Sequence, residues 1–165
     1  MNDMIKTNVL IVGNGPSGMT TALTLAKFGI ASTIIERRPT LYMEPRAHAL
    51  NSRTLEIFSA LGINLDDFKA LATPSEESNW VRWVDKLNAN EFGKLPYERM
   101  EDNGDLPSPH PLFNISQPNC ERVMQKYVDN EKLITTLRPC NWLSCEQVDE
   151  GVISIIADEQ GNESR

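Results

Sequence analysis

The sequence is poor in the residues from which metal sites and disulfide frameworks are built, with three cysteines and two histidines among 165 residues. Cys120, Cys140 and Cys145 form no C-x-x-C pair and cannot all pair with one another, so neither a zinc site nor a disulfide scaffold is predicted. No apolar run approaches the roughly 20 residues of a membrane span. The single lysine near the start precedes an apolar run of only Val9 to Val12, which is too short for a secretion signal. We therefore expect a cytoplasmic protein with reduced thiols and no membrane partner.

The chain also lacks an excess of positive charge. Sixteen Lys and Arg residues stand against 23 Asp and Glu residues, which gives a formal net charge of −7. This balance argues against a nucleic acid or an anionic membrane as the partner, because both attract clustered Lys and Arg side chains. With 40% hydrophobic residues, the chain is long enough for one domain with a real core, or for a domain and part of a second.

The first part of the chain alternates between strand and helix patterns. The run from Asn8 to Val12 is apolar and rich in β-branched residues, which is typical of a central parallel strand covered on both faces. Apolar residues at helical spacing follow from Met19 to Ala26, Gly29 is a suitable stop, and Ser32 to Glu36 is a second strand candidate. Together these segments predict a βαβ unit of about thirty residues.

The remainder predicts a mixture of loops, helices and strands. Prolines indicate a loop over 37–49, and prolines with Trp80, Trp83 and Tyr97 indicate short strands and turns, or a plain linker, over 74–111. Further helices are expected after a cap at Asn51 or Ser52, over 64–72 and over 119–130. Further strands are expected over 112–116 and 133–137, and two more strands, one on each side of a turn at 149–151. A second turn is expected at 160–162, with no strand after it to complete a hairpin.

A glycine pattern, Gly13-x-Gly15-x-x-Gly18, lies between the first predicted strand and the first predicted helix. Gly13 permits a tight turn, Gly15 lets a pyrophosphate approach the backbone, and Gly18 allows close packing of helix and strand. The helix N-terminus offers free N–H groups and a partial positive charge to the phosphates. Glu36, at the end of the next strand, can accept hydrogen bonds from ribose hydroxyls. The pattern predicts a site for the ADP half of FAD or NAD, the alternative being a glycine-rich turn that binds nothing.

Several segments carry a resemblance to a known family, namely Val9–Gly18, Ile35–Arg38, Pro45–Phe58, and Asn114–Gln117 followed by Glu121. In these segments the sequence resembles the N-terminal part of the group A flavoprotein monooxygenases, the FAD- and NAD(P)H-dependent aromatic hydroxylases with the p-hydroxybenzoate hydroxylase type of fold. The stretch from Pro45 to Phe58 is the most specific part, because a generic Rossmann protein has no need for it. The resemblance implies an α/β fold with a Rossmann-like FAD-binding βαβ parallel sheet, an appended β-meander and part of a substrate-side β layer.

The resemblance also implies how the chain is divided. Residues 1–74 would form the first part of the FAD-binding domain, residues 75–112 a segment of the substrate-side β layer, and residues 113–165 the continued and truncated FAD-binding domain. The family's later Asp-Gly and Gly-Asp blocks, and most of its substrate pocket, have no counterpart in this chain. We therefore expect the chain to be the front portion of a longer enzyme. Asn14 departs mildly from the family, which usually has Ala or Gly at that position.

The positions that match the family's cofactor contacts are Gly13, Gly15, Pro16, Ser17, Gly18, Glu36, Arg37, Arg46 and Gln117. The resemblance implies that the glycine-rich loop holds the FAD pyrophosphate and that Glu36 holds the adenosine ribose. It also implies that Arg37 lies beside the adenine. Arg46 would reach the flavin side of the cofactor and help to receive NAD(P)H, and Gln117 would touch the ribityl–phosphate region. A solvated loop arginine at 46 and a linker residue at 117 remain the alternatives. The resemblance assigns no catalytic side chain and no metal ligand within this chain.

The implied function is the hydroxylation of a small aromatic, phenolic substrate by molecular oxygen, with FAD as cofactor and NAD(P)H as co-substrate. In this family the reduced flavin captures oxygen as a C4a-hydroperoxide, which transfers one oxygen atom to an electron-rich ring. Two alternatives stay open, a non-catalytic nucleotide-binding fragment and another FAD-dependent oxidoreductase with the same front end. No nucleic acid or membrane partner is implied, and a homo-oligomer is compatible with the resemblance.

Overall fold

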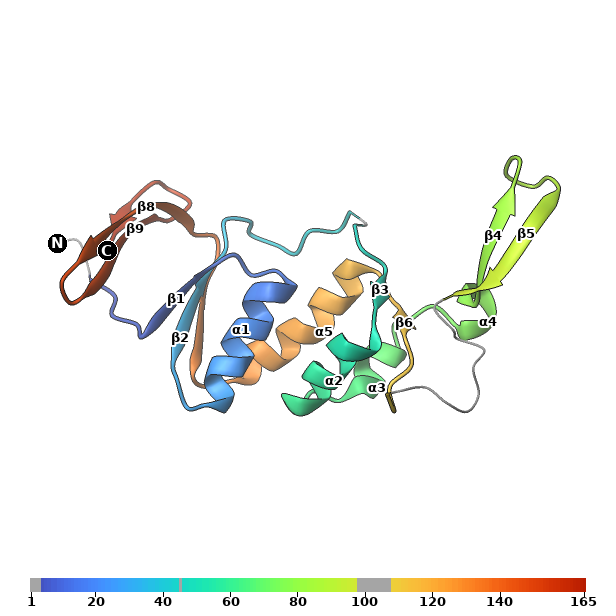
Figure 1. Cartoon of the computed structure of the whole chain (residues 1–165). Coiled ribbons are helices and arrows are strands. Elements are labelled where there is room, and N and C mark those ends of the chain that lie inside the picture. Colours follow the sequence, from blue (N-terminus) through green and yellow to red (C-terminus); the bar gives the residue numbers. More distant parts are fainter. Residues whose placement is uncertain (1–3, 45, 98–107) are drawn as a thin grey trace. The chain divides into compact units, whose positions relative to one another are not determined.

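The computed structural model describes residues 4–44, 46–97 and 108–165. The chain divides into two compact units, one made of Met1–Glu44 with Glu121–Arg165, and the other of Pro45–Cys120. Each unit is described by itself below, with its elements labelled as in Figure 1.

The first unit is built around a parallel sheet of three strands, β1 (Val9–Val12), β2 (Ser32–Ile35) and β7 (Ile134–Leu137), in the order β1-β2-β7. Both pairs are in parallel register, as Leu10 opposite Thr33 and Thr33 opposite Thr135 show. All four residues of the central strand β2 are buried, which explains its composition of β-branched residues and one serine. The predicted parallel strands at 8–12, 32–36 and 133–137 are confirmed, and so is the βαβ unit (Figure 1). The expectation that the 8–12 strand is central and covered on both faces is wrong, because among the described strands β1 pairs only with β2 and its Val12 is 59% exposed.

Two helices accompany this sheet. Helix α1 (Pro16–Lys27) connects β1 to β2, contacts all three strands of the sheet and buries Met19 and Ala22. It ends where Gly29 adopts a positive φ of 75°, a conformation that side chains with a Cβ rarely take. Helix α5 (Gln117–Asn130) precedes β7, begins two residues earlier than the expected 119, and buries Val123, Met124 and Val128.

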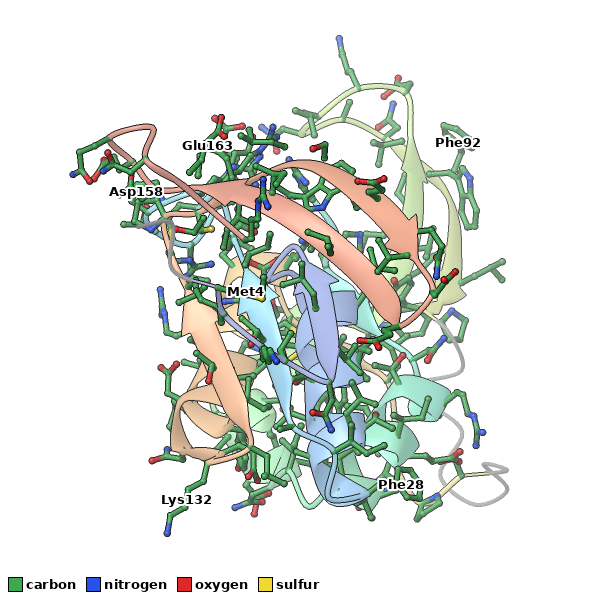
Figure 2. All side chains as sticks on the ribbon, turned by 90° about the vertical axis from the view of Figure 1, so that its left-hand side faces the viewer. Met4, Phe28, Phe92, Lys132, Asp158 and Glu163 are labelled. Atoms are coloured by element: carbon green, nitrogen blue, oxygen red, sulfur yellow. The ribbon has the colours of Figure 1, made fainter. Side chains whose placement is uncertain are left out.

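An antiparallel meander follows the parallel sheet in the same unit, formed by β8 (Asn141–Val148), β9 (Gly151–Ala157) and β10 (Glu163–Ser164). The prediction that no strand completes the second hairpin is wrong, because Glu163 pairs with Ala157 and Ser164 with Ile156. The reason lies in the turn that contains Asp158, which is labelled in Figure 2. The Asp158 carboxylate accepts hydrogen bonds from the backbone N–H groups of Gln160 and Asn162 at 2.9 and 2.8 Å. This local network reverses the chain so closely that two residues suffice for a return strand.

The described residues of the second unit form two short antiparallel sheets, three complete helices and the beginning of α5. Strand β3 (Ala49–Leu50) pairs with β6 (Phe113–Asn114), and β4 (Trp80–Val84) pairs with β5 (Glu91–Pro96). The expected loop over 37–49 is therefore one residue too long, because Ala49 already pairs with Asn114. The helices are α2 (Ser52–Ala60), α3 (Leu65–Lys69) and α4 (Ser75–Ser78). Phe58 of α2 and Phe68 of α3 stack with ring centroids 5.2 Å apart and form part of the core of this unit.

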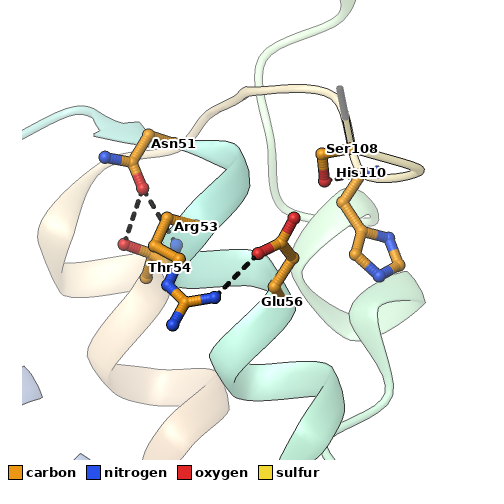
Figure 3. A network of polar contacts seen from close by, with 6 residues as sticks. All are labelled: Asn51, Arg53, Thr54, Glu56, Ser108 and His110. Atoms are coloured by element: carbon orange, nitrogen blue, oxygen red, sulfur yellow. Dashed lines mark hydrogen bonds and ion pairs between the residues drawn. The ribbon is translucent and has the colours of Figure 1, made fainter. Parts of the chain in front are cut away.

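Helix α2 contains most of the second half of the family-specific stretch that ends at Phe58, and its cap and its buried stripe explain why that part is helical. The sequence left Asn51 and Ser52 as alternative caps, and the structure selects Asn51, whose Oδ1 accepts hydrogen bonds from the N–H and the hydroxyl of Thr54 at 2.9 Å each (Figure 3). In the same helix, Arg53 and Glu56 form an ion pair at 3.1 Å, in which the Arg53 side chain is 78% exposed. Leu55 and Phe58 provide the buried stripe that the sequence predicted.

The segment expected as part of a substrate-side β layer is described only in part. Its central piece is the β4–β5 hairpin, on which Trp83 is 42% exposed and packs over Gly93. The Lys94 ammonium lies 3.5 Å from the centroid of the Trp80 ring, in a cation–π contact. Residues 98–107, including Pro107, lie outside the described part of the chain. In that described part, no helix combines the length and the apolar character needed to cross a membrane.

Candidate functional site

The glycine-rich loop, residues 13–18, lies at the carboxyl end of β1 and leads directly into α1. The N–H of Gly13 donates to the carbonyl of Ile35 at 2.8 Å, which ties the loop to the end of the neighbouring strand β2. Gly13 has a φ of 103°, so only glycine turns the chain here without strain. The Pro16-Ser17-Gly18 segment forms the first helical residues, with proline at a position where its missing N–H costs nothing.

Gly18 and Gly15 are needed for different reasons. A Cβ placed on Gly18 would lie 2.0 Å from the carbonyl oxygen of Gly13, so the turn and the helix can meet only because the side chain is absent. A Cβ placed on Gly15 would meet nothing within 4 Å. Open space in front of Gly15 is what a pyrophosphate needs in order to approach the backbone. Gly18 is therefore a packing requirement, and Gly15 borders space that a ligand can fill.

Helix α1 presents an N-terminus suited to an anion. Its cap residue is Gly15, and no side chain caps the first turn. The first turn also contains no acidic residue, whose charge would oppose a bound phosphate. The positive end of the helix and its first N–H groups are thus oriented toward the open space before the loop.

Glu36 follows β2 and lies beside the loop, as the spacing predicted. Its Oε2 accepts a hydrogen bond from the backbone N–H of Asn14 at 3.0 Å, and its Oε1 accepts one from the N–H of Arg38 at 2.9 Å. Each oxygen is therefore oriented by one backbone donor and keeps acceptor capacity for a further hydrogen bond. A pair of adjacent ribose hydroxyls is a matching set of donors.

The electrostatic surroundings keep the Glu36 carboxyl ionised. Partial burial raises its pKa, but the backbone N–H groups of Arg38 and Asn14 and the positive charges of Arg138 and Arg38 lower it by more. The net result is a pKa below its ordinary value of 4.5. The carboxylate is thus held in its charged, hydrogen-bond-accepting form by backbone donors and by the nearby positive charges of Arg138 and Arg38.

The other predicted site residues fall into two groups. Arg37 is exposed next to Glu36, in the same unit as the loop. Arg46 and Gln117 belong to the second unit, where the N–H of Gln117 donates to the carbonyl of Ala47 at 2.8 Å. The structure therefore brings the segment of Arg46 next to Gln117, although 71 residues separate them in sequence.

Sequence reasoning missed two features of the site. The first is Arg138, which follows β7 and whose positive charge lowers the pKa of Glu36. The predicted parallel strands could have indicated this proximity, because the carboxyl ends of parallel strands lie at the same edge of a sheet. Asn14 donates from its side-chain Nδ2 to Gln125 Oε1 of α5 at 2.7 Å. No spacing rule indicates that contact. In the described residues, no group of three or more His, Cys, Asp and Glu side chains is placed to hold a metal ion.

The chain matches the protein family described as "FAD binding domain" over residues 6–165. Among curated relatives, phenol 2-monooxygenase of Pseudomonas sp. (strain EST1001) is 32% identical over 155 residues, covering 91% of this chain and 25% of the relative. The 2,4-dichlorophenol 6-monooxygenase of Delftia acidovorans is 26% identical over 159 residues, covering 94% of this chain and 27% of the relative. The chain thus spans about a quarter of the length of these relatives.

Solved structures agree with this placement. The flavin-dependent monooxygenase PieE, in complex with FAD and substrate, superposes with a TM-score of 0.87 at 31% identity, covering 97% of this chain and 28% of that one. Aklavinone-11 hydroxylase, in a ternary complex with FAD and aklavinone, gives a TM-score of 0.85 at 25% identity, covering 100% of this chain and 32% of that one. The chain belongs to the FAD binding domain family, and it corresponds to the FAD-binding portion of flavin-dependent monooxygenases.

Two alanine substitutions separate the packing role of Gly18 from the open space at Gly15. Gly18→Ala places a Cβ against the Gly13 carbonyl, so we expect it to lower the free energy of unfolding by about 2 kcal/mol or more. Gly15→Ala meets no atom and should cost less than about 1 kcal/mol. Urea denaturation of both variants, compared with the unchanged chain, measures the difference. Equal losses of stability would contradict the distinction.

The lowered pKa of Glu36 predicts how stability depends on pH. Because the folded-state pKa lies below the ordinary 4.5, the carboxylate stabilises the fold above that pH, and this stabilisation is lost as the pH falls through the folded-state pKa. The free energy of unfolding should therefore fall more steeply with acidification below 4.5 in the unchanged chain than in Glu36→Gln. Urea denaturation from about pH 7 to about pH 3 tests this, and identical slopes would disprove it.

Proposed function

We propose that this chain binds the ADP half of FAD at the glycine-rich loop, and that the protein to which it belongs is an FAD- and NAD(P)H-dependent monooxygenase acting on a small phenolic substrate. The observation that carries the proposal is the position of the Glu36 carboxylate, fixed by Asn14 and Arg38 beside a loop that leaves space before Gly15. The relatives named phenol and dichlorophenol monooxygenases support the reaction type and the class of substrate.

The residues present fit the cofactor. The diphosphate would lie against Gly13, Gly15 and Ser17 at the N-terminus of α1, where free N–H groups and the helix dipole favour an anion. The adenosine ribose would donate its hydroxyls to Glu36. When bound, the flavin supplies the redox chemistry, namely reduction by NAD(P)H and activation of molecular oxygen. The net reaction converts a ring C–H, O₂, NAD(P)H and a proton into a ring C–OH, water and NAD(P)⁺.

The remaining assignments follow the same proposal. Arg37 would lie beside the adenine, and Arg46 and Gln117 would contact the flavin side and the ribityl–phosphate region. The hydrogen bond from Gln117 to Ala47 supports joint action of the last two residues. Residues 75–112 would contribute to the substrate-side β layer, between two parts of the FAD-binding domain at 1–74 and 113–165.

A second function from a different class rests on the coverage of the relatives. The chain spans 25–27% of the two monooxygenases described above, so it lacks a counterpart for most of their length. On this second hypothesis, the 165-residue chain binds a nucleotide and catalyses nothing. The two hypotheses agree on the ADP site and differ only in turnover.

Titration with FAD tests the nucleotide site directly. We expect FAD to bind the 165-residue chain saturably and ADP to displace it. An adenosine diphosphate with an added 2′-phosphate should not displace FAD, because the Glu36 carboxylate would repel that phosphate. Glu36→Ala removes charged hydrogen bonds and should weaken FAD binding about tenfold or more. Gly15→Ala should also weaken it, because the added Cβ occupies the approach of the pyrophosphate.

Flavin fluorescence at increasing protein concentration measures these affinities, with circular dichroism to confirm that each variant is folded. Arg53→Gln, on the exposed face of α2, is the matched control and should bind as the unchanged chain does. A folded chain that does not bind FAD, or a Glu36→Ala variant with unchanged affinity, would refute the proposed site.

Oxidation of NAD(P)H in the presence of FAD and a panel of phenols distinguishes the two hypotheses. We expect no phenol-dependent oxidation by the 165-residue chain, and expect it in a longer protein that contains this chain. Absorbance of the reduced nicotinamide and mass analysis of the phenol measure both arms. If neither the 165-residue chain nor the longer protein oxidises NAD(P)H in response to phenols, the non-catalytic hypothesis is favoured. Reduction of a double bond without incorporation of oxygen would favour a different FAD-dependent oxidoreductase.

A further inference from the structure

Asn14 is buried in the middle of the glycine-rich loop, yet its side chain is an amide. Only 2% of the residue is exposed. Its Nδ2 donates to Gln125 Oε1 at 2.7 Å, and Gln125 Nε2 in turn donates to Asp129 Oδ1 at 2.7 Å. Asn14, Gln125 and Asp129, here called the polar chain, thus connect the loop to the solvent-exposed side of α5. All of these residues lie within the first unit.

The carboxylate at the far end fixes the direction of every hydrogen bond in the polar chain. A carboxylate only accepts, so Gln125 must present Nε2 to Asp129 and therefore Oε1 to Asn14. Asn14 must then present Nδ2 to Gln125, and its Oδ1 is left on the other side. That Oδ1 is buried and finds no hydrogen-bond partner among the described residues. An isolated buried acceptor is unfavourable, so the amide of Asn14 contributes less to folding than its short hydrogen bond suggests.

The same residue also orients the ribose-binding carboxylate. The backbone N–H of Asn14 donates to Glu36 Oε2 at 3.0 Å, while its side chain donates to Gln125. The position of Asn14 is thus fixed from two directions, by β2 through Glu36 and by α5 through Gln125. Its neighbours Gly13 and Gly15 have no side chains with which to hold the loop.

We infer that the polar chain is a positioning device for the cofactor. It holds the glycine-rich loop against α5 in the conformation that receives the pyrophosphate, and it contacts no part of the cofactor itself. This inference rests on the proposed FAD site. It assigns to Asn14 and Gln125 an effect on FAD affinity that is separate from their contribution to stability.

Two substitutions and their combination test the inference. Asn14→Ala removes the amide and keeps the backbone N–H that Glu36 accepts, and Gln125→Met keeps the length of the side chain without its polar atoms. Each should weaken FAD binding about fivefold, and the double variant should be no weaker than either single one, because both remove the same contact. Asn14→Ala should leave the unfolding transition in urea unchanged or move it to higher urea, because it also removes the buried Oδ1.

Arg122→Met is the matched control, because Arg122 is an exposed residue on the same helix and is not part of the polar chain. It should bind FAD within about twofold of the unchanged chain. Unchanged affinity in both single variants would overturn the inference. So would a double variant whose loss is the product of the two single losses, or affinity losses that merely follow a loss of stability.

Amide hydrogen exchange measured without FAD tests the polar chain separately from the proposed FAD site, because no cofactor is needed for the measurement. If the polar chain holds the loop, Gln125→Met should accelerate exchange of the loop N–H groups, Asn14 included, and Arg122→Met should not. Unchanged exchange would overturn the inference whether or not FAD binds. Accelerated exchange in a chain that does not bind FAD would retain the positioning role and refute the proposed function instead.

Discussion

The proposed nucleotide site depends on one close approach, that of Gly18 to the carbonyl of Gly13. A Cβ at position 18 would lie 2.0 Å from that oxygen, so the beginning of α1 lies against the end of β1 only because residue 18 has no side chain. This contact brings the helix N-terminus to the edge of the sheet where β2 also ends. Without it, the positive end of the helix and the Glu36 carboxylate would not border the same space.

The sheet order explains how acidic and basic groups gather at that edge. β2 lies between β1 and β7, so the residues after all three strands, Gly13, Glu36 and Arg138, are neighbours although they are far apart in the sequence. Backbone donors orient Glu36, and the charge of Arg138 favours its ionised form. The burial of the carboxylate, which by itself would favour the neutral acid, is thereby outweighed.

The sequence predicted the parts of the site that local patterns specify. The apolar runs at 8–12 and 32–36, and the helical spacing from Met19 to Ala26 and over 119–130, were enough to predict two strands, two helices and the place of Glu36 at the end of the second strand. The contact between Asn14 and Gln125 was beyond reach, because 111 residues separate the two and neither belongs to a periodic pattern. Strand β10 was missed for a similar reason, since two residues are too few to show alternation.

On the proposed assignment, the charge on Glu36 also determines which ribose the loop accepts. An ionised carboxylate with acceptor capacity on both oxygens favours two free hydroxyls and disfavours a phosphate at the same position. FAD and NAD present the same ADP half to such a group, so the choice between them must come from contacts with the rest of the cofactor. On the proposed assignment those contacts are Arg46 and Gln117, which are carried by adjoining segments of the second unit.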